Sequence, residues 1–309
     1  MTDYFALSLP IFAVIAIGWG GMRSGLLPAA TVDVLGAFSF RVALPALVLR
    51  LIAGQPLSQT FEPAFYFGYL LSGGIVLAGA FTVSSRIAGQ GSAKAGAHAT
   101  TAAVSNLGFL GPPLMLAYFG DRGAGPLAMA ILAEVMVLMS IGSAIMASAR
   151  SAHIGSATVL LRSTVLNPVV SAIGLGALFA ALEWTLPKMM DRTLGYLAGA
   201  AGPTALFAIG GTLAALRLNR QTVVAAGTIA LAKIVIYPLL AWAVLKWGLK
   251  LDPLTVQAGV VLASLPPASS AFVLAQRYQA DEGRVSAALL LCTLASAATV
   301  PLAAWLAKA

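Results

Sequence analysis

Asn106-Leu107-Gly108-Phe109-Leu110-Gly111-Pro112-Pro113-Leu114 lies inside an apolar segment that is long enough to cross a membrane. Its two adjacent prolines lack backbone donors, and its two glycines lower the helix propensity of what remains. In hydrocarbon an unpaired backbone group costs several kcal/mol, so such a break persists only where protein, water or a ligand satisfies it. The stretch therefore predicts a broken membrane helix and a binding site.

A second stretch of this kind, Ser264-Leu265-Pro266-Pro267-Ala268-Ser269-Ser270, lies in the other half of the chain. Two interrupted segments in corresponding positions of two half-chains are typical of secondary transporters, and the amide-rich start of each second half favours an anion. The alternative is that the polar groups only tie the broken ends together. The predicted substrate contacts in these stretches are Asn106, Gly108, Gly111, Pro112, Pro113, Ser264, Pro266, Pro267, Ser269 and Ser270.

Composition places the chain in the membrane. It has 309 residues, 60% hydrophobic and 9% charged, with a mean hydropathy of +0.93. Soluble proteins carry roughly 25% charged residues. The net charge of +8 comes from Arg and Lys in short loops, which indicates membrane orientation rather than nucleic-acid binding. No ATP-binding G-x-x-x-x-G-K-[ST] motif is present. We expect no cofactor and no metal.

Ten apolar segments of about 20 residues fit the length, which predicts an all-α protein with ten transmembrane helices. The expected segments are residues 4–22, 32–53, 63–84, 96–118, 125–148, 160–182, 193–214, 222–246, 254–276 and 285–306. An even number of spans places both termini on one side. Basic residues in the loops, including Arg150, Arg162 and Arg217, favour termini outside a bacterial inner membrane.

The two halves share landmarks in the same order. Pro45 in the second segment precedes Pro203 in the seventh by 158 residues, and the two Pro-Pro pairs are 154 residues apart. Because each half has five spans, an odd number, the second half must enter the membrane from the opposite side. The sequence thus predicts two inverted five-helix repeats, residues 1–153 and 154–309, in one membrane domain.

Three ionisable residues are expected at membrane depth: Arg41, Glu134 and Lys233. A charge there costs at least about 2.5 kcal/mol on insertion scales, so it normally faces protein or a water-filled cavity. Arg41 and Lys233 are candidates for attracting an anion, or alternatively for pairing with Glu134. Glu134 is a candidate proton carrier or a static counter-ion. His98 is expected to be an interfacial residue at a helix end.

The chain resembles the auxin efflux carrier family over nearly its whole length. The resemblance rests on Phe40-Arg41-Val42-Ala43-Leu44-Pro45-Ala46-Leu47, on the two interrupted stretches, on Asn167-Pro168, and on Leu274-Ala275-Gln276-Arg277-Tyr278. It implies that broken helices 4 and 9 cross near the membrane centre, with a core that moves against a scaffold. Bacterial members of that family include transporters of malonate and malate.

These observations predict a secondary transporter of a small organic anion, such as malonate or malate, working by alternating access with proton coupling. The alternatives are efflux of indole-type weak acids and sodium-coupled symport of the bile acid transporter type. The absence of an acidic residue near the second break disfavours a sodium site of that type. Neither H-E-x-x-H nor a paired-aspartate motif is present, so an enzyme is not expected. The expected partners are the anion, H⁺ or Na⁺, the lipid bilayer and a second copy in a homodimer.

Overall fold

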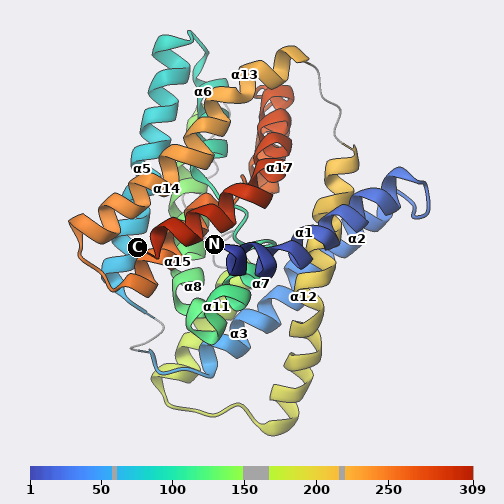
Figure 1. Ribbon diagram of the computed structural model, residues 1–309, viewed down its shortest axis with the longest axis vertical. Coiled ribbons are helices and arrows are strands. Elements are labelled where there is room, and N and C mark those ends of the chain that lie inside the picture. The colour runs from blue at the N-terminus through green and yellow to red at the C-terminus, as the bar shows by residue number, and fades with distance from the viewer. Residues whose placement is uncertain (58–60, 149–166, 216–219, 309) are drawn as a thin grey trace. The chain divides into compact units, whose positions relative to one another are not determined.

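The structure is a computed structural model that describes residues 1–57, 61–148, 167–215 and 220–308 (Figure 1). These residues form helices joined by turns and, within the described ranges, contain no β-strand. The predicted all-α class is therefore confirmed. The predicted repeat boundary at 153/154, the start of the sixth segment and the loop residues Arg150, Arg162 and Arg217 lie outside the described residues.

Seven helical runs in the described residues are long and apolar enough to cross a membrane. They are Thr2–Arg23, Ala30–Ala53, Pro63–Ile87, Gly111–Ser148, Lys188–Ala215, Thr222–Gly248 and Glu282–Ala307. Two shorter apolar helices are Pro168–Ala181 and Pro253–Ser264. This is a multi-pass membrane protein, and the arrangement of ten spans as an inverted repeat stays a prediction.

The chain forms two compact units, and each takes segments from both halves of the sequence. Unit 1 comprises Met1–Glu62, Leu107–Met129 and Val165–Leu216. Its elements are α1 (Thr2–Arg23), α2 (Ala30–Phe38), the π-helical turn η1 (Ser39–Ala43), α3 (Leu44–Ala53), α7 (Gly111–Phe119), η3 (Gly120–Gly123), the first residues of α8 (Ala124–Leu132), α11 (Pro168–Ala181) and α12 (Lys188–Ala215).

Small residues allow the helices of unit 1 to approach closely. A Cβ on Gly210 of α12 would lie 2.0 Å from the carbonyl oxygen of Ile15 in α1. A Cβ on Gly18 would lie 2.3 Å from the carbonyl oxygen of Phe207. Membrane helices associate by this kind of close backbone packing, because burial of apolar surface gives no net drive in lipid. The α1–α12 pair is thus specified by glycines on both helices.

Unit 2 comprises Pro63–Asn106, Ala130–Thr164 and Arg217–Ala309. Its elements are α5 (Pro63–Thr82), η2 (Val83–Ile87), α6 (Ser92–Ala103), η4 (Ala133–Leu138), α9 (Met139–Ser148), α13 (Arg220–Leu231), η5 (Ala232–Ile236), α14 (Tyr237–Trp242), η6 (Ala243–Gly248), α15 (Pro253–Ser264), α16 (Ser269–Arg277) and α17 (Glu282–Ala307). Within this unit α5 packs on α6, α13 on α17, and α14 on α15.

Large apolar side chains cover the outside of unit 2. Phe67 and Leu71 of α5 are 64% and 56% exposed, and Leu239 of α14 is 56% exposed. A water-soluble protein rarely exposes apolar surface on this scale, whereas acyl chains solvate it without cost. These positions are therefore the lipid-facing surface.

Both predicted helix breaks are present. The second contains its two prolines, whereas the first lies upstream of its prolines. The first break covers residues 104–110, between α6 and α7, and the second covers 265–268, between α15 and α16. Pro112 and Pro113 lie in the first turn of α7, where a missing N–H costs nothing, so the expectation that they interrupt the helix is wrong. Ser264 ends α15 and Ser269 begins α16.

Candidate functional site

The irregular residues of the two breaks pair with each other inside unit 2. The backbone N–H of Asn106 donates to the Pro266 carbonyl at 2.8 Å. The N–H of Ala268 donates to the Val104 carbonyl at 3.2 Å, and Ser105 and Pro267 form an isolated antiparallel bridge. Each break thereby satisfies backbone groups that hydrocarbon would leave unpaired.

Ser105, at the centre of this pairing, holds two residues that were expected at membrane depth. Its backbone N–H donates to Oε2 of Glu134 at 2.7 Å. Its hydroxyl oxygen accepts from Nζ of Lys233 at 2.6 Å. Glu134 is 1% exposed and Lys233 is fully buried. The fold thus brings an acid and a base together on one residue of the broken helix.

Two buried tyrosines complete the arrangement. The hydroxyl of Tyr69 donates to Oε1 of Glu134 at 2.8 Å, and that of Tyr237 lies 3.5 Å from the same oxygen. Nζ of Lys233 also donates to the Ala263 carbonyl at 3.2 Å, and it lies 4.4 Å from the centre of the Tyr237 ring. We call Tyr69, Ser105, Glu134, Lys233 and Tyr237 the charged cluster.

The cluster carries one acid and one base, so its formal charge is zero. Across the described residues, Glu134 and Lys233 do not approach within ion-pair distance of each other; Ser105 lies between them. Removing two charges from water is tolerable only when each is hydrogen-bonded and the other is near. Any further charge that enters the cluster must therefore be offset.

The three ionisable residues expected at depth share a local geometry. Arg41 lies in η1, Glu134 in η4 and Lys233 in η5, and each of these is a π-helical turn. π-helical turns are rare and often occur at functional sites, because they shift a side chain relative to the regular helix. The sequence patterns contained no sign of this distortion.

The start of α16 is open toward the second break. No side chain caps it. The Ala271 amide donates to the Ala268 carbonyl at 3.0 Å, which leaves the amides of Ser269 and Ser270 without a partner within the helix. Ser269 is half-buried, and the exposed hydroxyl of Ser270 lies 3.7 Å from Sδ of Met139. The Ser264 hydroxyl instead donates to the Val261 carbonyl at 2.7 Å, within its own helix. Ser269 and Ser270 are thus better placed than Ser264 to offer donors to a ligand.

The remaining predicted site residues belong to unit 1. A Cβ on Gly111 would lie 2.7 Å from the side chain of Leu127, whereas one on Gly108 would meet Phe40 and Leu44 at ordinary contact distance. Pro112 is buried and Pro113 half-buried in α7.

Arg41 is exposed within unit 1. Among the described residues, no carboxylate pairs with its guanidinium.

Sequence reasoning missed several members of the cluster. Tyr237 follows Lys233 by four residues, one helical turn, so their shared face was readable from the sequence. Ser105 directly precedes the predicted Asn106. Tyr69 lies in a uniformly apolar helix, where no pattern distinguished it. The expectation for His98 was wrong: it is 3% exposed and bonded to Ser84 and Asp281.

Comparison with known proteins gives a consistent result. The family model described as "Membrane transport protein" matches residues 4–304. A "Putative malonate transporter" of Rhizobium meliloti (strain 1021) is 33% identical over 97% of this chain and 94% of its own length. An "Uncharacterized transporter" of Methanothermobacter thermautotrophicus is 28% identical over 95% of each chain. The "Uncharacterized transporter YfdV" of Escherichia coli (strain K12) is 24% identical over 98% of this chain and 97% of its own.

Proposed function

This chain belongs to the membrane transport protein family, as its resemblance to the auxin efflux carriers predicted, and on that premise we propose that it carries a small dicarboxylate of the malonate type across the inner membrane. The observation that carries the proposal is the charged cluster, in which Lys233 and Glu134 meet on Ser105 between the paired helix breaks. Transport would proceed by alternating access around these breaks.

Lys233 and the start of α16 are the proposed anion contacts. Lys233 is held on Ser105, which pairs with Pro267, two residues before α16 begins. A helix start carries about half a positive charge and unpaired amides, which suit a carboxylate. We also assign the side chain of Asn106 to this site, because the hydrogen bond from its backbone N–H to the Pro266 carbonyl places it where the two breaks meet. Arg41 also remains a proposed anion contact. The reason is that its guanidinium is exposed in unit 1 and has no partner among the described residues.

The charge of the cluster supports proton coupling. With Glu134 and Lys233 both ionised the cluster is neutral, so each carboxylate of a bound substrate adds one excess negative charge in a low-dielectric site. One proton on Glu134 would offset one of the two charges of a dicarboxylate. Glu134 is therefore the proposed proton carrier, with H⁺ as the coupling ion in place of Na⁺.

The test is uptake of labelled malonate into proteoliposomes under an imposed pH gradient, an imposed sodium gradient or neither. The variants are Glu134→Gln and Asn106→Ala, with Glu183→Gln as a matched control at an exposed position. We expect wild-type uptake to follow the pH gradient, Asn106→Ala to lose uptake, and the control to be unchanged.

Glu134→Gln separates coupling from binding. It should lose the response to the pH gradient but keep exchange of internal for external malonate, because exchange requires no net proton movement. Uptake that follows sodium alone, or that still responds to pH in Glu134→Gln, would refute the coupling. If malonate is not transported under any gradient while an indole acid is, the dicarboxylate assignment is wrong.

A further inference from the structure

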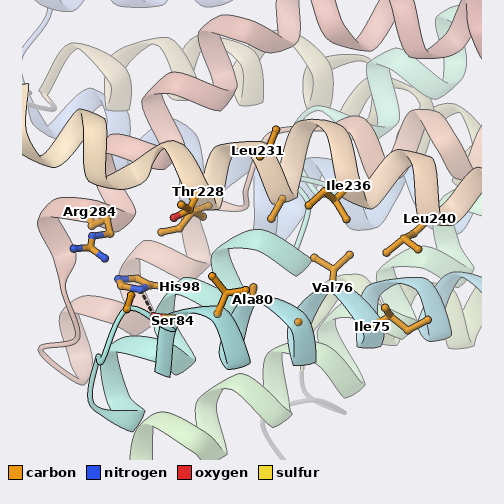
Figure 2. Close-up of a pocket in the computed structure, with 15 residues that line it drawn as sticks. Ile75, Val76, Ala80, Ser84, His98, Thr228, Leu231, Ile236, Leu240 and Arg284 are labelled. Atoms are coloured by element: carbon orange, nitrogen blue, oxygen red, sulfur yellow. Dashed lines mark hydrogen bonds between the residues drawn. The ribbon is translucent and has the colours of Figure 1, made fainter. Parts of the chain in front are cut away.

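A groove of about 410 Å³ lies on unit 2, and none of the residues assigned to transport lines it (Figure 2). It runs between α5 with η2 and α13 with η5, and α6 and α17 contribute at one end. Apolar side chains line most of it, among them Ile75, Val76, Ile236 and Leu240. A long apolar channel of this kind matches an extended hydrocarbon chain better than a small polar solute.

The polar residues of the groove gather at one end. Figure 2 shows Arg284, Thr228, His98 and Ser84 at that end and Leu240 at the other. The hydroxyl of Thr228 makes no hydrogen bond to any residue in the described ranges. The groove is thus amphipathic along its length.

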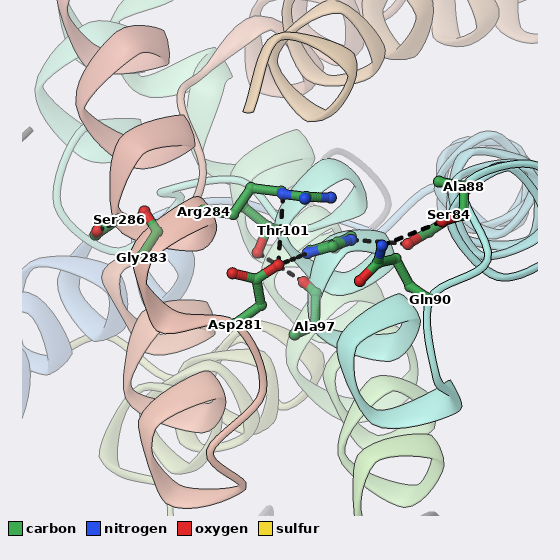
Figure 3. Close-up of polar contacts among 10 residues, drawn as sticks. Ser84, Ala88, Gln90, Ala97, Thr101, Asp281, Gly283, Arg284 and Ser286 are labelled. Carbon is green, nitrogen blue, oxygen red and sulfur yellow. Dashed lines mark hydrogen bonds and ion pairs between the residues drawn. The ribbon is translucent and has the colours of Figure 1, made fainter. Parts of the chain in front are cut away.

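A hydrogen-bonded chain fixes the polar end (Figure 3). The Ser84 hydroxyl lies 2.7 Å from Nδ1 of His98, and Nε2 of His98 lies 3.0 Å from Oδ2 of Asp281. The same oxygen lies 3.4 Å from Nε of Arg284. Asp281 has a φ of 57°, a costly left-handed conformation for a residue other than glycine, which these contacts hold in place. The side chains at this end of the groove are therefore held in fixed positions by their hydrogen bonds.

Arg284 keeps donors that face the groove. Its Nε lies 3.4 Å from Oδ2 of Asp281, and its guanidinium pairs with no other carboxylate within the described part of the chain. Exposed Arg86, at the C-terminal end of η2, and exposed Lys94, in the first turn of α6, flank the short connection between these two helices. The end of the groove thus offers positive charge with a free guanidinium edge, which suits a phosphate.

We propose that this groove binds an anionic phospholipid, with one acyl chain along its apolar wall and the phosphate on Arg284. The groove opens on α5 and α13, whose exposed apolar residues face lipid. With both termini outside, as the loop charges predict, its basic end lies in the cytoplasmic leaflet, where anionic lipids concentrate.

Lipid in this groove would also support the charged cluster. Ala232, which lines the groove, directly precedes Lys233 in η5, and α5 carries Tyr69. A bound acyl chain would restrain both elements. This effect on transport rests on the proposed function, whereas lipid binding itself does not.

The test measures lipid binding to the purified full chain by native mass spectrometry and by thermal unfolding. The probes are phosphatidylglycerol, phosphatidylcholine and, as a soluble anion without acyl chains, glycerol phosphate. We expect phosphatidylglycerol to bind at least about tenfold more tightly than phosphatidylcholine. Both lipids carry the phosphate, but the choline ammonium of phosphatidylcholine would lie among the basic side chains at this end of the groove and be repelled. Glycerol phosphate should give no stabilisation.

Two variants address the two ends of the site. Gly79→Phe places a ring in the groove, since Gly79 lines it and a Cβ there meets nothing within 4 Å. Its matched control is Gly74→Phe, on the same helix, equally open and outside the groove lining. Arg284→Gln removes the phosphate contact, with Arg277→Gln as its control.

We expect Gly79→Phe and Arg284→Gln each to abolish the preference for phosphatidylglycerol, and both controls to keep it. Because Arg284→Gln also alters the contact with Asp281, Gly79→Phe decides the matter if that variant is unstable. Equal binding of the two lipids, unchanged lipid binding in Gly79→Phe, or equal stabilisation by glycerol phosphate would overturn the proposal. Loss of malonate uptake with lipid binding intact would count against the proposed function alone.

Discussion

Two π-helical turns, one in each unit, carry a basic residue that the sequence predicts at membrane depth, but their surroundings are opposite. Lys233 in η5 is fully buried, and its ammonium is bonded to Ser105 and to the Ala263 carbonyl. Arg41 in η1 is exposed, and its guanidinium has no carboxylate partner in the described ranges. The same local distortion therefore serves two different electrostatic environments.

A buried ammonium and an exposed guanidinium bind an anion in different ways. A buried ammonium must exchange an existing partner for the ligand, and its removal leaves a nearby carboxylate uncompensated. An exposed guanidinium can accept a carboxylate in a bidentate contact with no partner to displace. Lys233 is thus expected to affect both stability and transport, whereas Arg41 is expected to affect ligand affinity alone.

The largest effect is expected for Lys233→Met. Breaking a buried pair by removal of one partner costs about 3–5 kcal/mol, because Glu134 is left charged and unpaired. Malonate uptake should be lost, and thermal unfolding in detergent should shift strongly downward. Lys246→Met is the matched control, since Lys246 also lies in a π-helical turn and over an aromatic ring, at 5.2 Å from Trp242.

The double variant Lys233→Met with Glu134→Gln distinguishes a structural pair from a transport site. With both charges removed, stability should largely return, but uptake should not. Uptake at the wild-type rate in the double variant would mean that the cluster is only a structural brace, and the comparison with Arg41 would lose its meaning.

Tyr69→Phe tests how much one hydrogen bond to Glu134 contributes to the stability of the charged cluster. The Tyr69 hydroxyl donates to Glu134 at 2.8 Å, and a hydrogen bond to a charged group contributes about 1.5–3 kcal/mol. We expect a loss of stability of that size, measured by chemical or thermal unfolding. Tyr66→Phe, on the same helix and without a hydrogen bond from its hydroxyl to a described residue, should leave stability unchanged.

The exposed side is tested with Arg41→Gln. Loss of a bidentate contact should raise the KM for malonate about tenfold, equivalent to about 1.4 kcal/mol, with thermal stability unchanged. Arg41→Lys should recover only part of the affinity, because an ammonium lacks the planar fork. If Arg41→Gln destabilises the protein as much as Lys233→Met, or if it behaves like the exposed control Arg23→Gln in KM, the proposed contrast is wrong.

The smallest effect is expected for Tyr237→Phe. Its hydroxyl lies 3.5 Å from Glu134, beyond the range of a strong hydrogen bond, while its ring, 4.4 Å from Lys233, would remain. The expected loss of stability is below about 1 kcal/mol, the value of an ordinary hydrogen bond. A loss larger than that of Tyr69→Phe would mean that Tyr237 is the principal donor to Glu134.

Much of the fold was predictable because its causes are local or compositional. The apolar content required membrane helices, and the chain does form helices long enough to cross a bilayer. Both interruptions were predicted from prolines and glycines. The second break falls on Pro266 and Pro267, as predicted. The exact position of the first was not predicted, because Pro112 and Pro113 are tolerated in the first turn of α7 and the break falls upstream of them.

The candidate site was predictable only in part. The cost of a charge in hydrocarbon singled out Arg41, Glu134 and Lys233, since that cost depends on residue type and depth alone. His98 was misjudged because nothing in its own helix reports Asp281, a partner 183 residues away.

The sequence by itself determined that this chain is a multi-pass helical membrane protein with two broken segments. Hydropathy acts through the solvation of each residue and proline through its own backbone, so neither requires knowledge of tertiary contacts. The tertiary structure alone decided that Ser105 joins Glu134 to Lys233 and that their helices carry π-helical turns. Those contacts depend on which helices pack together, and the sequence of a single segment does not show which helix will be its neighbour.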